Sequence, residues 1–416
     1  MSKIKLGSVL KIKHGYAFKT ENYVPKSRFR LVTLGNFEEG NNSFKYNDTK
    51  ATYYEGFFPE EVILQPMDLI MPLTEQVIGL FGNSAFIPES EDYTFVLNQR
   101  VGKVVVNEKK LDKIYAHYLL ATENVKKQLE HRATGTRQRN ISPNDVYDVS
   151  VILPSVNEQK RIGMLLYSIE EKQKLNNKII SELESMAKTL YDYWFLQFDF
   201  PGDNGKPYKS SGGKMVYNEE LKREIPEGWE VVELGHIFAF NKGRIPDNIV
   251  NKFDECYSSP YITIDVANGG IPLYCSPKNM VECKGETIMV MDGAASGDIY
   301  LGNYGSLGST FSKLTSLKDD VSNSLIYCIL KANSFVYKKA NTGSTVPHAN
   351  KHFIESMKLP IPKSCMFFSY QLDKLYSKIH NCRCENRDLA SLRDFLLPML
   401  MNGQVTFKDA AEAHND

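Results

Sequence analysis

The chain has 416 residues, of which 42% are hydrophobic and 24% are charged. This composition is typical of a globular protein, and the length exceeds what one ordinary core supports, so two or three domains are expected. The 50 basic and 50 acidic residues cancel. That balance excludes a uniformly basic DNA binder and leaves local basic faces, or partner proteins, to supply any positive charge.

The sequence predicts neither a membrane segment nor a metal site. No apolar run approaches the ~20 residues that span a bilayer, and lysines interrupt the opening "MSKIKLGSVLKIKHG" before a signal peptide could form. The seven cysteines all lie in the second half at irregular spacing, which fits a reducing cytoplasm. Cys382 and Cys384 lack C-x-x-C spacing and no second pair follows, so zinc is not expected.

The first 155 residues are predicted to form a mixed α and β domain. The short runs 61–73 and 100–106 are rich in β-branched residues and are bounded by Gly, Pro or Asn, as strands are. Residues 111–133 place apolar side chains on or near one face, which predicts a single amphipathic helix.

A long helix is predicted over 162–196, because apolar residues recur with heptad spacing. At ~1.5 Å per residue it would be on the order of 50 Å long, which suits a spacer. The a positions are Ile162, Ile169, Asn176, Leu183 and Leu190, and the d positions are Leu165, Ile179, Met186 and Tyr193, with Lys172 as the one break.

The helix ends in an aromatic cluster that contains Tyr191, Trp194 and Phe195. Two interpretations stay open for this cluster: ordinary burial in the protein itself, or a surface on which another subunit docks. A stretch rich in Gly, Lys and Ser follows and predicts a loop up to about residue 217.

The second half repeats this order. Strand-like runs lie at 260–266 and 286–293, and the Gly- and Ser-rich stretch 292–310 is interpreted as loops that connect strands rather than as a nucleotide cradle. A second heptad helix follows, which Pro398 is expected to stop or kink. Its a positions are Leu372, Ile379, Asn386 and Arg393, and its d positions are Leu375, Cys382, Leu389 and Leu396.

Matching offsets indicate an internal duplication. Leu6-Gly7 recur as Leu234-Gly235 at an offset of 228 residues (234 − 6), and Thr134-Gly135 recur as Thr342-Gly343 at 208 (342 − 134). The second copy has therefore lost about twenty residues from its middle. The two helices align at 210 (386 − 176), which places one Asn near the middle of each apolar seam.

The matched asparagines suggest how the two helices pair. A polar residue at an a position fixes register in coiled coils, and Asn176 and Asn386 would meet near the centre of an antiparallel pair. The alternative is that each helix packs on a separate domain. The fold class expected is α+β: two similar domains separated by two long antiparallel helices, with an internal pseudo-twofold axis.

Catalysis is not supported by any motif, since no P-loop, G-x-S-x-G or H-E-x-x-H pattern is present. DNA binding is better supported, because arginines can bind phosphates or guanine, Gln and Asn can pair with adenine, and Gly lets the backbone approach closely. A solvated loop beside a packed helix is the alternative. The candidate DNA-binding residues are Arg132, Thr134, Gly135, Thr136, Arg137, Gln138, Arg139 and Asn140 in the first copy, and Thr342, Gly343, Ser344, Thr345, His348, Asn350 and Lys351 in the second.

Over essentially its full length the chain resembles the specificity subunit of a Type I restriction-modification system. The resemblance rests on "LPSVNEQKRIGMLL" (153–166), "YDYWFLQFDFP" (191–201), "NGKPYKSSGGKMVYNEELKREIPEGW" (204–229) and the repeated Leu-Gly opening. It implies a first target recognition domain at 1–155, a central conserved helix and linker at 156–217, a second recognition domain at 218–363, and a distal conserved helix and tail at 364–416.

The resemblance also implies partners and a mechanism. The chain would not be an enzyme and would bind double-stranded DNA, two modification (methyltransferase) subunits and restriction (motor-nuclease) subunits. It would bind no cofactor itself, with S-adenosylmethionine, ATP and Mg expected in the partners. In the second copy "KSCMFFSYQLDKL" replaces the Pro-x-x-E-Q-x-x-I signature. A scaffold that binds only proteins, or an inactive copy, remains the alternative function.

Overall fold

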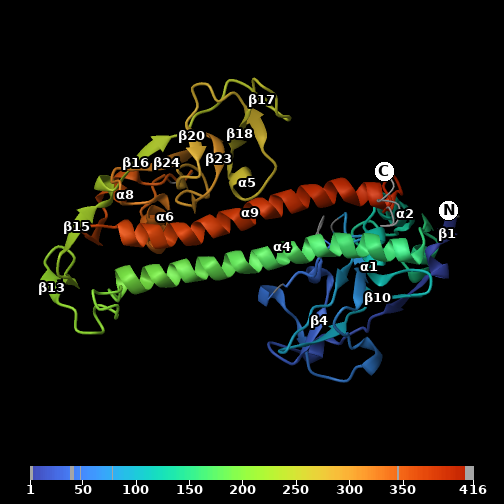
Figure 1. The fold of residues 1–416 in the computed structure, drawn as a ribbon. Helices are drawn as coiled ribbons and strands as arrows, with labels where there is room; N and C mark the ends of the chain where they lie inside the picture. The colour runs from blue at the N-terminus through green and yellow to red at the C-terminus, as the bar shows by residue number, and fades with distance from the viewer. Residues whose placement is uncertain (1–2, 38–41, 47, 77, 344–345, 408–416) are drawn as a thin grey trace, which may run out of the picture. The chain divides into compact units, whose positions relative to one another are not determined.

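The computed structural model describes residues 3–37, 42–46, 48–76, 78–343 and 346–407 (Figure 1). The chain divides into two compact units, which we describe separately. Unit 1 comprises Met1–Gln173 and Arg387–Asp416, and unit 2 comprises Lys174–Asn386. The two long helices, α4 (Val156–Tyr191) and α9 (Met366–Met401), each begin in one unit and end in the other.

Unit 1 is built on two four-stranded sheets, ordered β2-β10-β6-β8 and β3-β5-β4-β9. Among the described residues, three short α-helices, five 3-10 helices, the start of α4 and the end of α9 contribute to it. The elements before α4 are β1 (Lys3–Lys5), β2 (Leu10–His14), β3 (Tyr23–Val24), β4 (Phe29–Val32), β5 (Tyr53–Tyr54), β6 (Leu69–Pro72), β7 (Thr74–Glu75), β8 (Ala85–Phe86), β9 (Thr94–Leu97), β10 (Val101–Val106), α1 (Lys113–Leu120), α2 (Glu123–Arg132), β11 (Arg139–Asn140), α3 (Pro143–Tyr147) and β12 (Ser150–Ile152).

Strand β6 explains why its sequence is continuously apolar. Side chains alternate between the two faces of a strand. Leu69 and Met71 enter the core formed with the helices, whereas Ile70 enters the core under the second sheet. Both faces of β6 are buried, so no polar residue alternates with the apolar ones.

Unit 2 has the same plan, with sheets ordered β16-β24-β21-β22 and β17-β19-β18-β23-β20. A π-helix, Asp192–Leu196, continues α4. The other elements are β13 (Met215–Asn218), β14 (Arg223–Pro226), β15 (Trp229–Glu233), β16 (Phe238–Lys242), β17 (Ile249–Val250), β18 (Ser259–Ile262), α5 (Ile264–Ala267), β19 (Leu273–Cys275), β20 (Glu282–Lys284), β21 (Ile288–Val290), β22 (Ile299–Tyr300), β23 (Tyr304–Leu307), β24 (Phe311–Ser316), α6 (Asn323–Ala332), α7 (Ser334–Lys339), α8 (Lys351–Ser356) and β25 (Lys358–Pro362).

Strand registers confirm the duplication. Lys5 pairs with Ser150 and Glu233 pairs with Lys358, which reproduces the offsets 228 (233 − 5) and 208 (358 − 150). The missing residues can now be located. Parallel pairs β4·β9 and β18·β23 match Val32 with Ile262 at 230 (262 − 32), and Leu97 with Leu307 at 210 (307 − 97). The loss of twenty residues (230 − 210) therefore falls between the two strands of this parallel pair.

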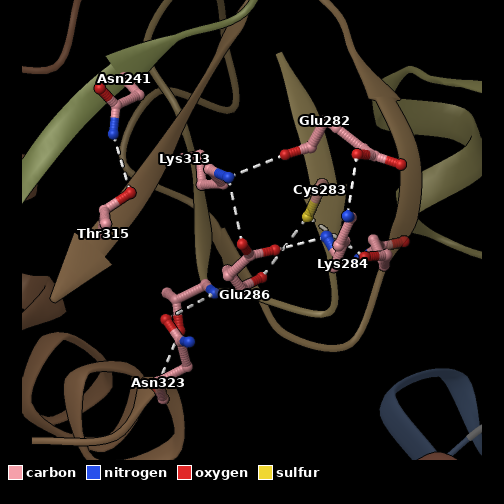
Figure 2. A network of polar contacts seen from close by, with 10 residues as sticks. Asn241, Glu282, Cys283, Lys284, Glu286, Lys313, Thr315 and Asn323 are labelled. Carbon is pink, nitrogen blue, oxygen red and sulfur yellow. Dashed lines mark hydrogen bonds and ion pairs between the residues drawn. The ribbon is translucent and has the colours of Figure 1, made fainter. Parts of the chain in front are cut away.

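A partly buried ion pair recurs at the same place in both copies. In unit 1 the Lys103 ammonium lies 2.5 Å from the Asp68 carboxylate. In unit 2 the Lys313 ammonium lies 3.1 Å from the Glu286 carboxylate and also donates to the Glu282 carbonyl at 2.8 Å (Figure 2). Since Lys103 and Lys313 differ by 210, the pair is a shared element of the repeated fold rather than an accident of one copy.

Two predicted elements were wrong in detail. Residues 111–133 form two helices instead of one, because Thr122 is extended (φ −63°, ψ 145°) and its hydroxyl donates to the Leu119 carbonyl at 2.7 Å. The run 260–266 is half strand and half helix, since the Thr263 side chain accepts a hydrogen bond from the Val266 N–H and begins α5.

The heptad pattern of α4 fails toward its C-terminal end. Met186 and Tyr193, at predicted d positions, are exposed, and their neighbours Ala187 and Trp194 are buried instead. A straight helix of 3.6 residues per turn drifts by ~20° per heptad, so after three heptads the d position lies ~60° off the seam and the next residue, ~40° away on the other side, lies closer to it. In α9, Pro398 does not end the helix, which continues to Met401.

Candidate nucleic-acid interface

The Thr-Gly segment of unit 1 folds into a closed loop. The Thr134 N–H donates to the Asn140 carbonyl at 3.0 Å, and the Asn140 N–H donates to the Thr134 carbonyl at 2.8 Å. Thr136 and Arg137 lie exposed between these two ends. We call residues 134–140 the first Thr-Gly loop. Its closed base holds the exposed tip in one place.

Gly135 is required by the shape of this loop. Its φ is +105°, and a Cβ atom built on it would lie 2.2 Å from the Gln138 carbonyl oxygen. No side chain fits at that distance, so the loop can close only with glycine at this position.

Unit 2 repeats the closure of this loop. The Thr342 N–H donates to the His348 carbonyl at 2.9 Å, and the His348 N–H donates back at 2.8 Å. Gly343 has φ +89°, and its Cβ would meet the Val346 carbonyl oxygen at 2.2 Å. Residues 342–348 form the second Thr-Gly loop. Its candidates Ser344 and Thr345 lie outside the described residues.

The first loop is anchored by an acid that the sequence analysis missed. Strand β11 pairs with β7, and the Arg139 guanidinium lies 3.2 Å from the Glu75 carboxylate, which is 1% exposed. The other oxygen of Glu75 accepts the backbone N–H groups of Leu80 at 3.0 Å and Phe81 at 3.3 Å. Glu75 therefore joins the Thr-Gly loop to the loop that follows β7.

The second loop has an equivalent anchor of different chemistry. His348 Nδ1 lies 2.8 Å from an Asp292 oxygen, whose other oxygen lies 3.5 Å from the Lys242 ammonium. The Ser296 hydroxyl donates to the Pro347 carbonyl at 2.7 Å. Glu75 and Asp292 each follow an apolar strand closely, and that placement was the one available signal for them in the sequence.

Most candidate side chains in and beside the first Thr-Gly loop bond within unit 1. The Arg132 guanidinium donates to the Gln128 carbonyl at 2.7 Å, and Arg139 is held by Glu75, so both act within the unit. The Asn140 side-chain oxygen accepts from the Thr74 hydroxyl at 2.8 Å, and its amide lies 3.4 Å from the Gln138 carbonyl.

Arg137 stands apart from these residues. Its guanidinium is exposed and has no hydrogen-bond or ion-pair partner among the residues that the structure describes. A guanidinium at the tip of a closed loop can bind a phosphate or the edge of a guanine. Arg137 is therefore the strongest single candidate for a DNA contact in unit 1.

In unit 2 the candidates beyond the loop begin helix α8. The Asn350 side chain accepts the Phe353 N–H at 3.1 Å and caps the helix. Lys351 lies 3.5 Å from Glu355, one turn further on. The structure thus gives Asn350 a local folding role and leaves the Lys351 ammonium half exposed.

Comparisons with known proteins identify the family. The profile described as "Type I restriction modification DNA specificity domain" matches residues 1–185 and 226–365. The chain belongs to this family. The first matched segment runs through most of α4, and the second ends at residue 365, directly before α9 begins.

Named relatives agree with the profile. The chain is similar to the MjaIX specificity subunit of Methanocaldococcus jannaschii, with 27% identity over 316 residues, covering 71% of this chain and 69% of the relative. It is also similar to the EcoBI specificity subunit of Escherichia coli, with 26% identity over 241 residues, covering 56% of this chain and 46% of the relative. DNA recognition is the function that family membership supports.

The fold has a solved counterpart in the same family. The specificity subunit from M. genitalium superimposes with a TM-score of 0.64 at 18% identity, covering 96% of each chain. This likeness supports the α+β fold with two similar domains and long helices. Among the described residues, no helix is both long enough and apolar enough to cross a bilayer.

The helix seam of this specificity-domain protein contains the expected asparagine contact. Within unit 2 the Asn176 amide donates to the Asn386 side-chain oxygen at 3.0 Å and to the Glu385 carboxylate at 2.8 Å. The Asn386 amide in turn donates to the Asn177 side chain at 2.8 Å. Asn176 is 1% exposed, so its bonds join the two helices in the interior of the pair, as expected of a polar residue that fixes register.

Burial excludes one of the two interpretations of the aromatic cluster. Tyr191, Trp194 and Phe195 are all at least 95% buried in unit 2. The Trp194 and Phe195 rings pack on Phe368 of α9, with centroids 5.3 and 5.0 Å away. Their predicted role in docking a partner is therefore corrected, because no partner can reach rings that the unit itself covers.

Proposed function

We propose that this chain reads a split, asymmetric duplex DNA target and scaffolds the catalytic subunits of a Type I restriction-modification complex. Each unit would recognise one half of the target. The observation that supports this proposal is the Thr-Gly loop, which occurs twice with the same closing hydrogen bonds and a glycine at positive φ in the same place.

The side chains on the two loops support an asymmetric target. The frames are equivalent, yet Arg137, Gln138 and Asn140 in the first loop correspond at the offset 208 to Thr345, Val346 and His348 in the second. Identical frames with different donors and acceptors would read different bases through the major groove. Two unlike half-sites follow from one duplicated fold.

The partner subunits and compartment belong to the same proposal. We expect two modification (methyltransferase) subunits and restriction (motor-nuclease) subunits to assemble on this chain in the cytoplasm. The chain would be non-catalytic and would bind no cofactor, while S-adenosylmethionine, ATP and Mg would be bound by the partners. Support comes from membership of the family.

The experiment that tests this function is selection of random duplex DNA by the chain in complex with its modification subunit. Two short, unlike motifs at one fixed spacing are expected in the bound pool. A pool without enrichment, from a complex that had assembled, would instead favour a scaffold that binds only proteins, or an inactive copy.

The continuous helices suggest what sets the spacing. Because α4 and α9 each run from one unit into the other, one added turn in both, about 5.4 Å, should change the preferred gap by one or two base pairs of ~3.4 Å. The half-sites themselves should not change. A variant that kept its original gap would show that the helices do not determine the spacing.

A further inference from the structure

A cavity of about 160 Å³ lies in unit 1, beside the ends of both long helices. Its walls combine apolar side chains, among them Leu119, Ile162 and Leu400, with the polar side chains of Asn124 and Glu158. We call it the helix-end cavity. An apolar cavity of ~150 Å³ accommodates one benzene ring, so this cavity is of the size of a single aromatic side chain.

The duplication shows what covers the corresponding surface in unit 2. Glu158 corresponds to Phe368 and Ile162 to Leu372, both at the helix offset of 210 (368 − 158 and 372 − 162). In unit 2 Phe368 is buried under Trp194, Phe195 and other rings at centroid distances of 5.0 to 6.3 Å. The surface that is open in unit 1 is thus closed by aromatic side chains in unit 2.

The difference can be traced to how each helix ends. In unit 2, α4 continues into the π-helix Asp192–Leu196, which places the Trp194 and Phe195 rings over Phe368. In unit 1, α9 stops at Met401, and Gly403 turns the chain with φ +68°. The sequence "MNGQ" at this end contains no ring that could take the same place.

We propose that the helix-end cavity receives an aromatic side chain from a partner protein, the modification subunit. This inference rests on the proposed function for the identity of the partner. The polar rim specifies the ring further, because the Glu158 carboxylate is an acceptor and the Asn124 side-chain oxygen, which accepts from the Gln128 amide at 3.3 Å, has a second lone pair. Tryptophan or tyrosine, each an apolar ring with one donor, satisfies both the walls and the rim.

The chain's own tail fits the cavity less well. The N–H groups of Gln404 and Val405 both donate to the Met399 carbonyl, at 2.9 and 3.3 Å, which holds the start of the tail against the helix end. The next ring, Phe407, lies exposed and has no donor for the Glu158 carboxylate. An incoming side chain from another molecule meets neither restriction.

Photocrosslinking would identify the occupant directly. The photoreactive residue p-benzoylphenylalanine is placed at position 124, on the rim, in the full chain co-expressed with its modification subunit. The matched control carries it at position 127, an exposed site on the same helix outside the cavity lining. We expect a crosslink from position 124 alone, to a modification-subunit peptide that contains Trp or Tyr. Crosslinks to residues 404–416 of the same chain, or to a second copy, would overturn the proposal.

Affinity gives a second measurement. Asn124→Trp would fill the cavity from its own rim and should weaken the equilibrium binding of the modification subunit by roughly tenfold or more, as expected for loss of an anchor in a pocket. Lys127→Trp should leave the affinity unchanged, and thermal unfolding of both variants reports that they fold. Equal affinities for the Asn124→Trp variant and the unaltered chain would overturn the proposal, as would the absence of any complex.

The two proposals fail in different ways. If the complex assembles and crosslinks from position 124 but selects no DNA motif, then DNA recognition is wrong and the docking inference stands. If it selects a split motif while position 124 gives no crosslink, then docking at this cavity is wrong and DNA recognition stands.

Discussion

Replacing the loop glycines tests the assignment of the DNA interface most directly. In Gly135→Ala the new Cβ would lie 2.2 Å from the Gln138 carbonyl oxygen, so the loop cannot keep its closed form. Positive φ costs a residue with a side chain ~1–2 kcal/mol, and the two bonds between Thr134 and Asn140 stabilise the loop by ~0.5–1.5 kcal/mol each. The loop should open while the buried core of the unit, which it only borders, stays folded.

DNA selection by the assembled complex is the assay. Gly135→Ala should relax base preference in one half-site, since a lost base contact is worth ~1–3 kcal/mol, or roughly 5- to 150-fold in discrimination. Gly343→Ala, with the same 2.2 Å clash in unit 2, should relax the other half-site only. Each variant serves as the control for its counterpart.

Gly205→Ala is a control that places a side chain at a positive φ without a steric clash. Gly205 also has positive φ, +71°, but a Cβ there would meet nothing within 4 Å. This variant should therefore retain both half-sites. The reasoning is refuted if Gly135→Ala keeps full preference at both half-sites while hydrogen exchange shows that the Asn140 N–H has lost its protection.

Three further variants test the loop tip, the helix seam and the repeated ion pair. Arg137→Ala should relax one base position by ~1–3 kcal/mol if the guanidinium contacts a base, and a uniform loss with a shallower salt slope would mark a phosphate contact instead. In Asn176→Leu the gain from burying Leu, ~1.5–3 kcal/mol, is opposed by the loss of one bond to the Glu385 carboxylate, ~1.5–3 kcal/mol, and one to the Asn386 oxygen, ~0.5–1.5 kcal/mol. The free energy of unfolding should therefore change little or fall, while gap selectivity broadens; an unchanged gap would count against a register role. Burial acts to raise the pKa of Glu286, but hydrogen bonds from the Lys284 N–H and from Lys313 outweigh it and lower the pKa. Above the ordinary Glu pKa of 4.5 the pair should therefore stabilise unit 2 by about 1 kcal/mol. This stabilisation is lost as the pH falls through the lowered pKa of Glu286. The loss of stability caused by Lys313→Met, measured by thermal unfolding, should therefore be smaller at about pH 3.

Periodicity and repeat offsets predicted the parts of the fold that depend on local pattern. The offsets 228 and 208 correspond to strand registers, and the helix alignment placed Asn176 opposite Asn386. The break at Thr122 was missed because one extended residue barely disturbs an apolar stripe. The slip of the α4 seam was missed because a strict heptad ignores the drift of a straight helix.

The loop candidates show a different limit. Arg137 and Arg139 are equivalent in the sequence, two residues apart in one basic stretch. What separates them is Glu75, which lies 64 residues earlier in the chain (139 − 75) and binds only Arg139. No local pattern contains that information, since the pairing arises when β7 and β11 meet in the folded unit.

The two anchors also indicate what can change independently in such a protein. Each Thr-Gly loop is tied to the loop after a central strand by an acid, Glu75 in one copy and Asp292 in the other, and each acid faces a base two or fewer residues from the end of its loop. Arg139 forms an ion pair with the buried Glu75, whereas Asp292 lies close to both His348 and Lys242. A tip residue such as Arg137 touches neither anchor, so base preference can vary at the tip while the acid and its base must be exchanged together.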